Sequence, residues 1–115
     1  MKVKDIVEKL NLQVYAGRDG LEREVKCGYC GDLLSEVMGK APESSIWLTI
    51  QGHQNIIAVA ILREISAIVV SAGYVPDAKT KEKADEEKVP LLLWDGPIFE
   101  LAGQLFNLIE NFKNT

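Results

Sequence analysis

Residues 20–35 read GLEREVKCGYCGDLLS, and they carry more structural information than any other part of the chain. They follow directly on the turn Gly17-Arg18-Asp19-Gly20. Leu12 and Val14 precede this turn, and Val25 restores the apolar alternation after it. An Asp-Gly pair between two such segments is typical of a β-hairpin. The stretch therefore predicts a hairpin that ends near Val25.

The segment Cys27-Gly28-Tyr29-Cys30 holds both cysteines of the chain and reads as a glycine-rich turn. A helix is expected to begin near Asp32 and to end at Gly39, because glycine commonly closes helices. Upstream, the apolar residues of the first ten positions recur at helical spacing, at Val3, Ile6, Val7 and Leu10. An N-terminal helix therefore precedes the hairpin.

The pattern changes downstream, where short runs that are apolar on both faces alternate with helical patterns. Such runs suit strands of a parallel sheet that is covered on both sides. Strand–helix alternation of this kind indicates βαβ units. We predict a single α/β domain over residues 1–115: a small, mostly parallel sheet with three core strands, flanked by helices, with the N-terminal helix and hairpin. The strand runs are SIWLTI (45–50), AIVV (67–70) and LLLW (91–94), and the helical patterns are 56–65, 76–88 and a last helix from Pro97.

Composition excludes several classes of function. The net charge of −4 argues against a nucleic-acid partner, which favours a basic surface. No apolar run approaches the ~20 residues that cross a bilayer, so no membrane association is expected. The charged N-terminus MKVKDIVEKL lacks the apolar stretch of a signal peptide. A cytoplasmic protein with reduced thiols is therefore expected.

The sequence resembles the DRTGG domain family, a group of small modules named after a degenerate motif. The order and spacing of TIQGHQNIIAVA (49–60), SAIVVSAGYVPD (66–77) and VPLLLW (89–94) look like the same family. Three positions depart from the motif: Glu22 replaces its Asp, Lys26 its Thr and Cys27 its first Gly. The residues that match it are Arg23, Val25, Gly28, Tyr29, Asp32, Leu33 and Leu34.

The resemblance implies an α/β fold, frequent dimerisation and a regulatory or assembly role. DRTGG domains occur alone and within larger proteins, and they are similar to the N-terminal domain of HPr kinase/phosphorylase. The P-loop of that kinase, GxxxxGK[ST], is absent from this sequence. We therefore expect a free-standing, non-enzymatic regulatory or assembly module that needs no cofactor.

An alternative is a thiol–disulfide redox protein that uses Cys27 and Cys30. A CxxC pair between a strand and a helix is the local context of thioredoxin-like motifs, and a helix N-terminus lowers the pKa of a thiol. The order of the other elements does not fit that fold. A metal site is not expected, because structural zinc needs about four ligands and His53 adds only a third from a distant segment.

The segments that follow the apolar runs form a second candidate site. Ligands of open parallel sheets bind beyond the carboxyl ends of the strands. These segments offer glycines for close approach, amides and a hydroxyl for hydrogen bonds, and helix N-termini that suit anions. The same residue types are common in ordinary turns. The candidate residues for a small anionic ligand are Gln51, Gly52, His53, Asn55, Ser71, Gly73 and Asp95.

The C-terminal helix carries an apolar arc wider than one core-facing stripe requires. Phe112 belongs to the stripe, and Phe99, Ala102 and Phe106 widen it; the aromatic members are Phe99, Phe106 and Phe112. Aromatic side chains of this kind dominate interface energetics. The helix therefore either lies deep in its own core or packs on a second subunit. We predict a homodimer with these three phenylalanines as candidate interface residues.

Overall fold

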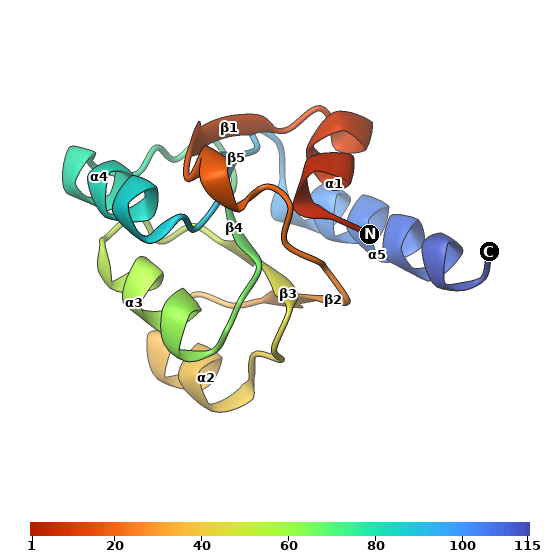
Figure 1. The fold of residues 1–115 in the computed structure, drawn as a ribbon, viewed down its shortest axis with the longest axis horizontal. Helices are drawn as coiled ribbons and strands as arrows, with labels where there is room; N and C mark the ends of the chain where they lie inside the picture. The colour runs from red at the N-terminus through yellow and green to blue at the C-terminus, as the bar shows by residue number, and fades with distance from the viewer.

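Helices and strands alternate along most of the chain in the computed structural model, which describes all residues from 1 to 115 (Figure 1). Local sequence signals account for the helix ends. Lys2 N donates to Asp5 Oδ2 (2.9 Å) at the first helix, Asp77 Oδ1 accepts from Thr80 N (2.8 Å) at the fourth, and Pro97 precedes the fifth. The elements are α1 (Val3–Leu10), β1 (Gln13–Ala16), a 3₁₀ turn (Arg18–Gly20), β2 (Cys27–Cys30), α2 (Leu34–Lys40), β3 (Ser45–Thr49), α3 (Asn55–Leu62), β4 (Ala67–Val70), α4 (Ala78–Glu87), β5 (Leu91–Leu93) and α5 (Ile98–Lys113).

The strands form one five-stranded sheet in the order β1-β5-β4-β3-β2. β2, β3, β4 and β5 run parallel, and only β1 is antiparallel, paired with β5. The three predicted core strands are its central members, and every residue of β3, β4 and β5 is buried. The α/β, mostly parallel fold is therefore confirmed, with two additional strands at the edges.

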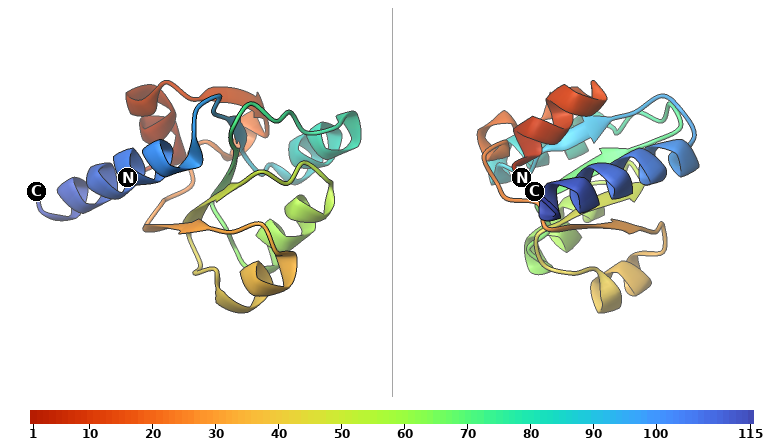
Figure 2. Two further views of the ribbon diagram at one scale, coloured as in Figure 1. Left: turned by 180° about the vertical axis from the view of Figure 1, so that it is seen from behind. Right: turned by 90° about the vertical axis from the view of Figure 1, so that its right-hand side faces the viewer.

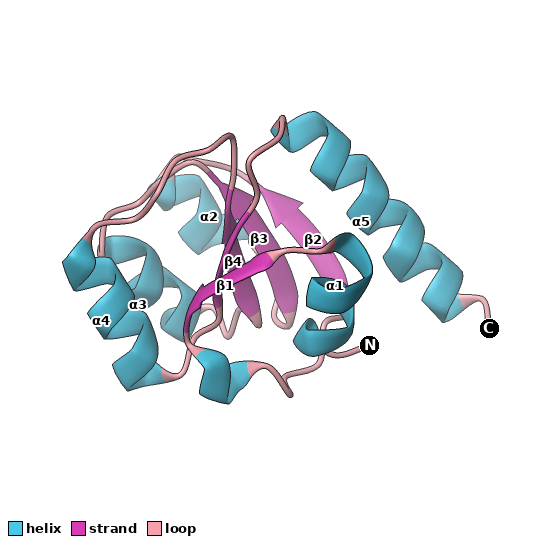
Figure 3. Cartoon of the chain, turned by 90° about the horizontal axis from the view of Figure 1, so that it is seen from above, coloured by secondary structure: helices cyan, strands magenta, loops and turns pink.

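Two helix layers cover the sheet, as the right-hand view of Figure 2 and the view in Figure 3 show. One face packs on α1 and α5 through Ile46, Leu48 and the α5 residues Leu101, Leu105 and Ile109. The other face packs on α2, α3 and α4 around Trp47 and Ile68. No helix has the length and apolar character that crossing a membrane requires.

The predicted N-terminal hairpin is wrong. β1 and β2 lie at opposite edges of the sheet and are not paired with each other. The turn at residues 17–20 forms, but it packs against the segment before β5: a Cβ on Gly17 would lie 1.9 Å from the Val89 oxygen, and one on Gly20 2.2 Å from the Lys88 oxygen. The two glycines therefore allow close backbone contact with residues 88–90 rather than a return of the chain along β1.

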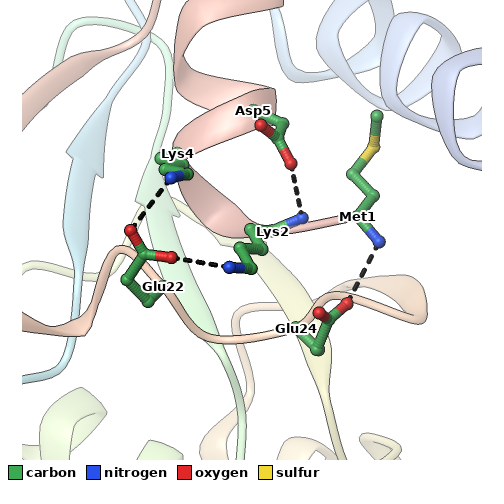
Figure 4. Close-up of polar contacts among 6 residues, drawn as sticks. All are labelled: Met1, Lys2, Lys4, Asp5, Glu22 and Glu24. Atoms are coloured by element: carbon green, nitrogen blue, oxygen red, sulfur yellow. Dashed lines mark hydrogen bonds and ion pairs between the residues drawn. The ribbon is translucent and has the colours of Figure 1, made fainter.

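The segment that the hairpin prediction paired with β1 instead runs beside the start of α1 (Figure 4). Val3 N donates to Arg23 O (2.9 Å), and Val25 N donates to Met1 O (2.7 Å). Glu22, at the position of the motif aspartate, accepts from Lys2 Nζ (2.8 Å) and Lys4 Nζ (3.0 Å). Hydrogen bonds that were expected within a hairpin are thus made to the N-terminus.

The segment Cys27–Cys30 is also not a turn before a helix but the edge strand β2. Each of its residues pairs with β3, from Cys27 opposite Ser45 to Cys30 opposite Leu48. The helix that follows begins at Leu34, two residues later than predicted, because Asp32 and Leu33 form the connection. Both cysteines are therefore held in extended backbone.

Candidate functional site

Asp32 organises the carboxyl end of the central sheet. Its Oδ1 accepts from the Thr49 hydroxyl (2.8 Å) and from Ile50 N (2.9 Å), and its carbonyl oxygen accepts from Gln51 Nε2 (3.0 Å). The first ligand candidate, Gln51, is thus already bound to the protein. The carboxylate of Asp32 fixes the β3–α3 connection where that connection leaves the sheet.

The next candidates, Gly52, His53 and Asn55, are tied to the start of α4 and to each other. Gly52 O accepts from the Thr80 hydroxyl (2.7 Å), and His53 Nδ1 accepts from Asn55 N (3.1 Å). Hydrogen bonds from the Thr80 backbone and hydroxyl lower the pKa of Asp77, with a smaller contribution from the charge of His53. Asp77 N also donates to Gly52 O (3.4 Å), so this connection lies against the start of α4.

Ser71, Gly73 and Asp95 lie on the two neighbouring connections. Gly73 N donates to Trp94 O (3.4 Å), which joins the loops after β4 and β5. Asp95 is exposed, whereas the hydroxyl of Ser71 is fully buried and has no hydrogen-bond partner. The structure brings the seven candidates to one edge of the sheet, but none of them lines any of the five main clefts.

The motif residues do not form one site. Arg23 lies at the amino end of the strands, where its Nη1 donates to Ile65 O (3.5 Å). Gly28 and Tyr29 belong to β2, and Asp32 lies at the carboxyl end. The motif therefore runs along the edge strand β2, from the amino end of the sheet to its carboxyl end. Its residues make separate local contacts and do not share one site.

The strand conformation separates Cys27 from Cys30. Three residues of extended chain place their Cα atoms about 10 Å apart, beyond the roughly 7 Å that a disulfide can span. Their side chains also point to opposite faces of the sheet, since they are an odd number of residues apart. Burial, and secondly the charge of Asp32, raise the pKa of the Cys30 thiol. No three His, Cys, Asp or Glu side chains gather where a metal ion could be held.

A cleft of about 280 Å³ lies between β2 and α5. All four residues of β2 line it, together with Leu48 and the α5 residues Ala102, Leu105, Phe106, Ile109, Glu110 and Lys113. Eight of the eleven lining residues are hydrophobic, so this is an apolar cleft, which we call the β2–α5 cleft. The sequence signal for it was the combination of Gly28, which has no side chain, with the wide apolar arc of the last helix.

The three predicted interface phenylalanines are all exposed, with 86% of Phe99, 66% of Phe106 and 52% of Phe112 accessible to solvent. Phe106 lines the β2–α5 cleft, and Phe112 lines a neighbouring hollow beside Met1 and Val25. Phe99 lies at the opposite end of the helix and lines neither. The core-facing side of α5 is formed by Leu101, Leu105 and Ile109 instead.

Comparisons with known proteins bear on the fold. No family model matches the chain, and no curated protein matches it significantly. Among solved structures, it is similar to the CBS and DRTGG domains of the regulatory region of Clostridium perfringens pyrophosphatase, a structure that contains the activator diadenosine tetraphosphate. The TM-score is 0.67 at 16% sequence identity, over 90% of this chain and 45% of that one. The chain thus spans less than half of that structure, and its fold is related to one that contains a DRTGG domain.

Proposed function

We propose that this chain is a non-enzymatic regulatory or assembly module of the DRTGG type, which works by contacts of its surface with another protein chain. The observation that carries the proposal is the apolar β2–α5 cleft beside the open edge of β2. A groove next to an unpaired strand edge offers both main-chain hydrogen bonds and an apolar surface to a partner.

The roles of the reactive side chains support this function over catalysis. Asp32 and Asp77 accept hydrogen bonds that fix connections at the ends of strands and helices. Cys27 and Cys30 are too far apart in β2 to exchange a disulfide with each other. The fold is also related to that of the regulatory region of another protein. A regulatory role is also what the DRTGG resemblance implies.

Capture of bound proteins by the wild type and by Phe106→Glu tests the assembly role. The matched control is Leu62→Glu, because Leu62 is 69% exposed on α3, in the opposite helix layer. The wild type and the control should retain the same partner, which includes a second copy of the chain, and Phe106→Glu should lose it. If Phe106→Glu retains every partner of the wild type, the cleft is not the assembly surface.

A second candidate function is the binding of a small anion at the carboxyl ends of the strands. It is favoured by the buried, unpartnered hydroxyl of Ser71 close to Gly73. A thermal-shift screen with nucleotides, diadenosine tetraphosphate and phosphorylated metabolites tests it. A ligand at ~100 times its Kd should raise the Tm by on the order of 10 °C, and Ser71→Ala should reduce the shift. A flat screen at millimolar concentrations contradicts this function.

A further inference from the structure

We propose that the carboxyl edge of the sheet is a second docking surface, which binds a basic amphipathic helix of another protein. Five exposed apolar side chains form this surface, and none of them lines the β2–α5 cleft. The inference therefore goes beyond the assembly role proposed above and does not depend on it. We call the surface the carboxyl-edge patch, and its residues are Leu33, Ile50, Tyr74, Val75 and Phe99.

The sheet topology brings these side chains to one end of the molecule. β2, β3, β4 and β5 are neighbours and run parallel, so their carboxyl ends meet at one edge. Leu33 follows β2, and Ile50 follows β3. Tyr74 and Val75 follow β4, and Phe99 is the second residue of α5, the helix after β5. Figure 3 shows α5 beginning at the end of the sheet toward which β2 points.

Hydrogen bonds hold the four connections at this edge side by side. Asp32 Oδ1, after β2, accepts from Ile50 N, after β3 (2.9 Å). Asp77 N, before α4, donates to Gly52 O, before α3 (3.4 Å). The bond to Trp94 O described above joins the loops after β4 and β5. The connections therefore form one row of three strand spacings, about 14 Å in all.

The fold of a single chain does not need the apolar side chains of the patch. None of the five packs against either of the two hydrophobic cores that cover the faces of the sheet. Four of them are more than half exposed, with 86% of Phe99, 65% of Leu33, 62% of Val75 and 56% of Tyr74 accessible to solvent. Removing these side chains should therefore leave the domain folded.

The exposed apolar area is sufficient for a protein partner. An aromatic side chain presents about 150–250 Å². At the observed exposures, Phe99 and Tyr74 alone would supply roughly a third of the ~800 Å² that each partner of a stable complex buries. Leu33, Val75 and Ile50 add to this area. Contiguous apolar patches of several hundred Å² mark interaction sites on soluble proteins.

The charge of the edge favours a basic partner. The four connections contain no lysine or arginine, but they contain Asp32, Asp77 and Asp95, which are exposed and form no ion pair. Glu100 adds a carboxylate in the first turn of α5, and Lys79 adds one cation at the start of α4. Helix N-termini offset part of this negative charge. Lysine or arginine at the margin of a partner is still attracted, whereas an acidic partner is repelled. The connections are residues 31–33, 50–54, 71–77 and 94–97.

The dimensions of the row match one face of an α-helix. A helix rises 1.5 Å per residue, so about three turns span the ~14 Å of the patch. Apolar side chains on one face of an amphipathic helix recur about every 5.4 Å, which is close to the ~4.8 Å between strands. Each turn of such a helix can therefore place one apolar side chain on each connection. Its basic side chains would then lie at the margin, beside Asp95 and Glu100.

A designed peptide provides a defined probe for the patch. It is a fluorescein-labelled amphipathic helix of ~14 residues, with leucine on one face and lysine elsewhere, long enough to span the row. A matched peptide carries glutamate in place of every lysine. In fluorescence anisotropy, the wild type should bind the lysine peptide with a Kd of about 10–100 µM and the glutamate peptide at least ~10 times more weakly. No binding of the lysine peptide at millimolar protein, or equal binding of both peptides, overturns the proposal.

Two serine variants with the net charge of the wild type locate the binding surface. Tyr74→Ser combined with Phe99→Ser should weaken binding of the lysine peptide at least ~10-fold, because the two largest apolar side chains of the patch are lost. Phe106→Ser is the matched control, since Phe106 lies on the same helix as Phe99 but lines the β2–α5 cleft. It should bind as the wild type does. Unchanged binding by the double variant overturns the proposal, because the peptide then responds only to the overall negative charge or to the cleft.

Two measurements distinguish the proposed partner from other occupants. In NMR spectra of the wild type, the lysine peptide should shift the amide signals of Ile50, Tyr74 and Phe99 and leave that of Gly28 unchanged. The largest shifts at Gly28 would place the peptide in the cleft and overturn the proposal. In sedimentation, the double serine variant should have the mass of the wild type. A dimer of the wild type that this variant loses would make a second copy of the chain the occupant, which also overturns the proposal. The Phe106→Glu test of the assembly surface is independent of both results.

Discussion

Cys30 is the residue at which the redox alternative can be tested. Burial and the nearby Asp32 raise the pKa of its thiol, so the thiolate fraction at neutral pH lies below that of a free cysteine. In a Cys27→Ser background, iodoacetamide should alkylate Cys30 more slowly than it alkylates a free cysteine at pH 7.5. The rate should rise only above the ordinary titration range of about pH 8.5.

Asp32→Asn provides the control for that measurement. The amide oxygen can still accept from Thr49 and Ile50, but the negative charge near the thiol is gone. The inflection of the alkylation rate should move to lower pH. Rapid alkylation of Cys30 below pH 7, or turnover in an insulin-reduction assay that Cys27→Ser abolishes, would favour the thiol–disulfide function.

Asp77 should make the stability of the domain dependent on acid pH. Hydrogen bonds from Thr80 lower its pKa in the folded state. A carboxyl with a lowered folded pKa contributes stability above its unfolded pKa of about 4, and that contribution is lost as the pH falls through the folded value. The Tm of the wild type should exceed that of Asp77→Asn at pH 7, and the difference should shrink toward pH 2. A difference that stays constant with pH contradicts this role.

Asp32 is expected to stabilise the fold rather than to bind a ligand. Asp32→Ala would leave the buried Thr49 hydroxyl and the Ile50 amide without their acceptor, at a cost of about 1–3 kcal/mol in the free energy of unfolding. Asp32→Asn should recover most of this loss, which urea denaturation would measure. Equal destabilisation by both substitutions would show that the charge, not the acceptor, matters.

At the level of elements, α5 has two faces that can be separated by mutation. Leu105 is 2% exposed, whereas Phe106 is 66% exposed. Leu105→Glu buries a carboxylate in the core between α5 and the sheet and should unfold the domain. Phe106→Glu should leave the circular dichroism spectrum and the Tm close to those of the wild type while removing self-association. If both variants unfold, Phe106 belongs to the core of one chain.

The elements that could be predicted are those whose signals are local. The runs at 45–50, 67–70 and 91–94 became β3, β4 and β5 because continuous apolar residues require burial on both faces. Pro97 and Asp77 marked helix starts by their backbone chemistry. The pairing of β1 with β5 across more than 70 residues left no local signal, and the Asp-Gly turn favoured the nearer partner.

The lack of a local signal for contacts between distant segments also explains what was missed at β2 and at the candidate site. Glycine is depleted in strands, so CGYC, with Gly28 within it and Gly31 directly after it, resembled a turn, and its pairing with β3 had no local signal. The strand-end residues were placed correctly at one edge, since topology alone brings them there. That Asp32 and Thr80 satisfy Gln51 and Gly52 depends on contacts between segments 19 and 28 residues apart. Such contacts could not be read from the sequence.

At the level of the whole molecule, the cleft exists because a short sheet ends at β2 while the long helix α5 continues beside it (Figures 1 and 3). An isolated copy leaves both the strand edge and the aromatic rings in water. Exposed edges of this kind are normally covered in native proteins. A second copy would cover the edge and the rings together, so the proposed assembly role and the homodimer prediction concern the same surface.

Sedimentation equilibrium of the wild-type chain at ~100 µM tests this account most directly, because that concentration lies well above a typical micromolar dissociation constant. The predicted mass is twice the 12.7 kDa of the chain, and Phe106→Glu should return it to that of one chain while Leu62→Glu leaves it doubled. A wild type that sediments as a single chain at this concentration, with the circular dichroism of a folded α/β domain, would contradict it.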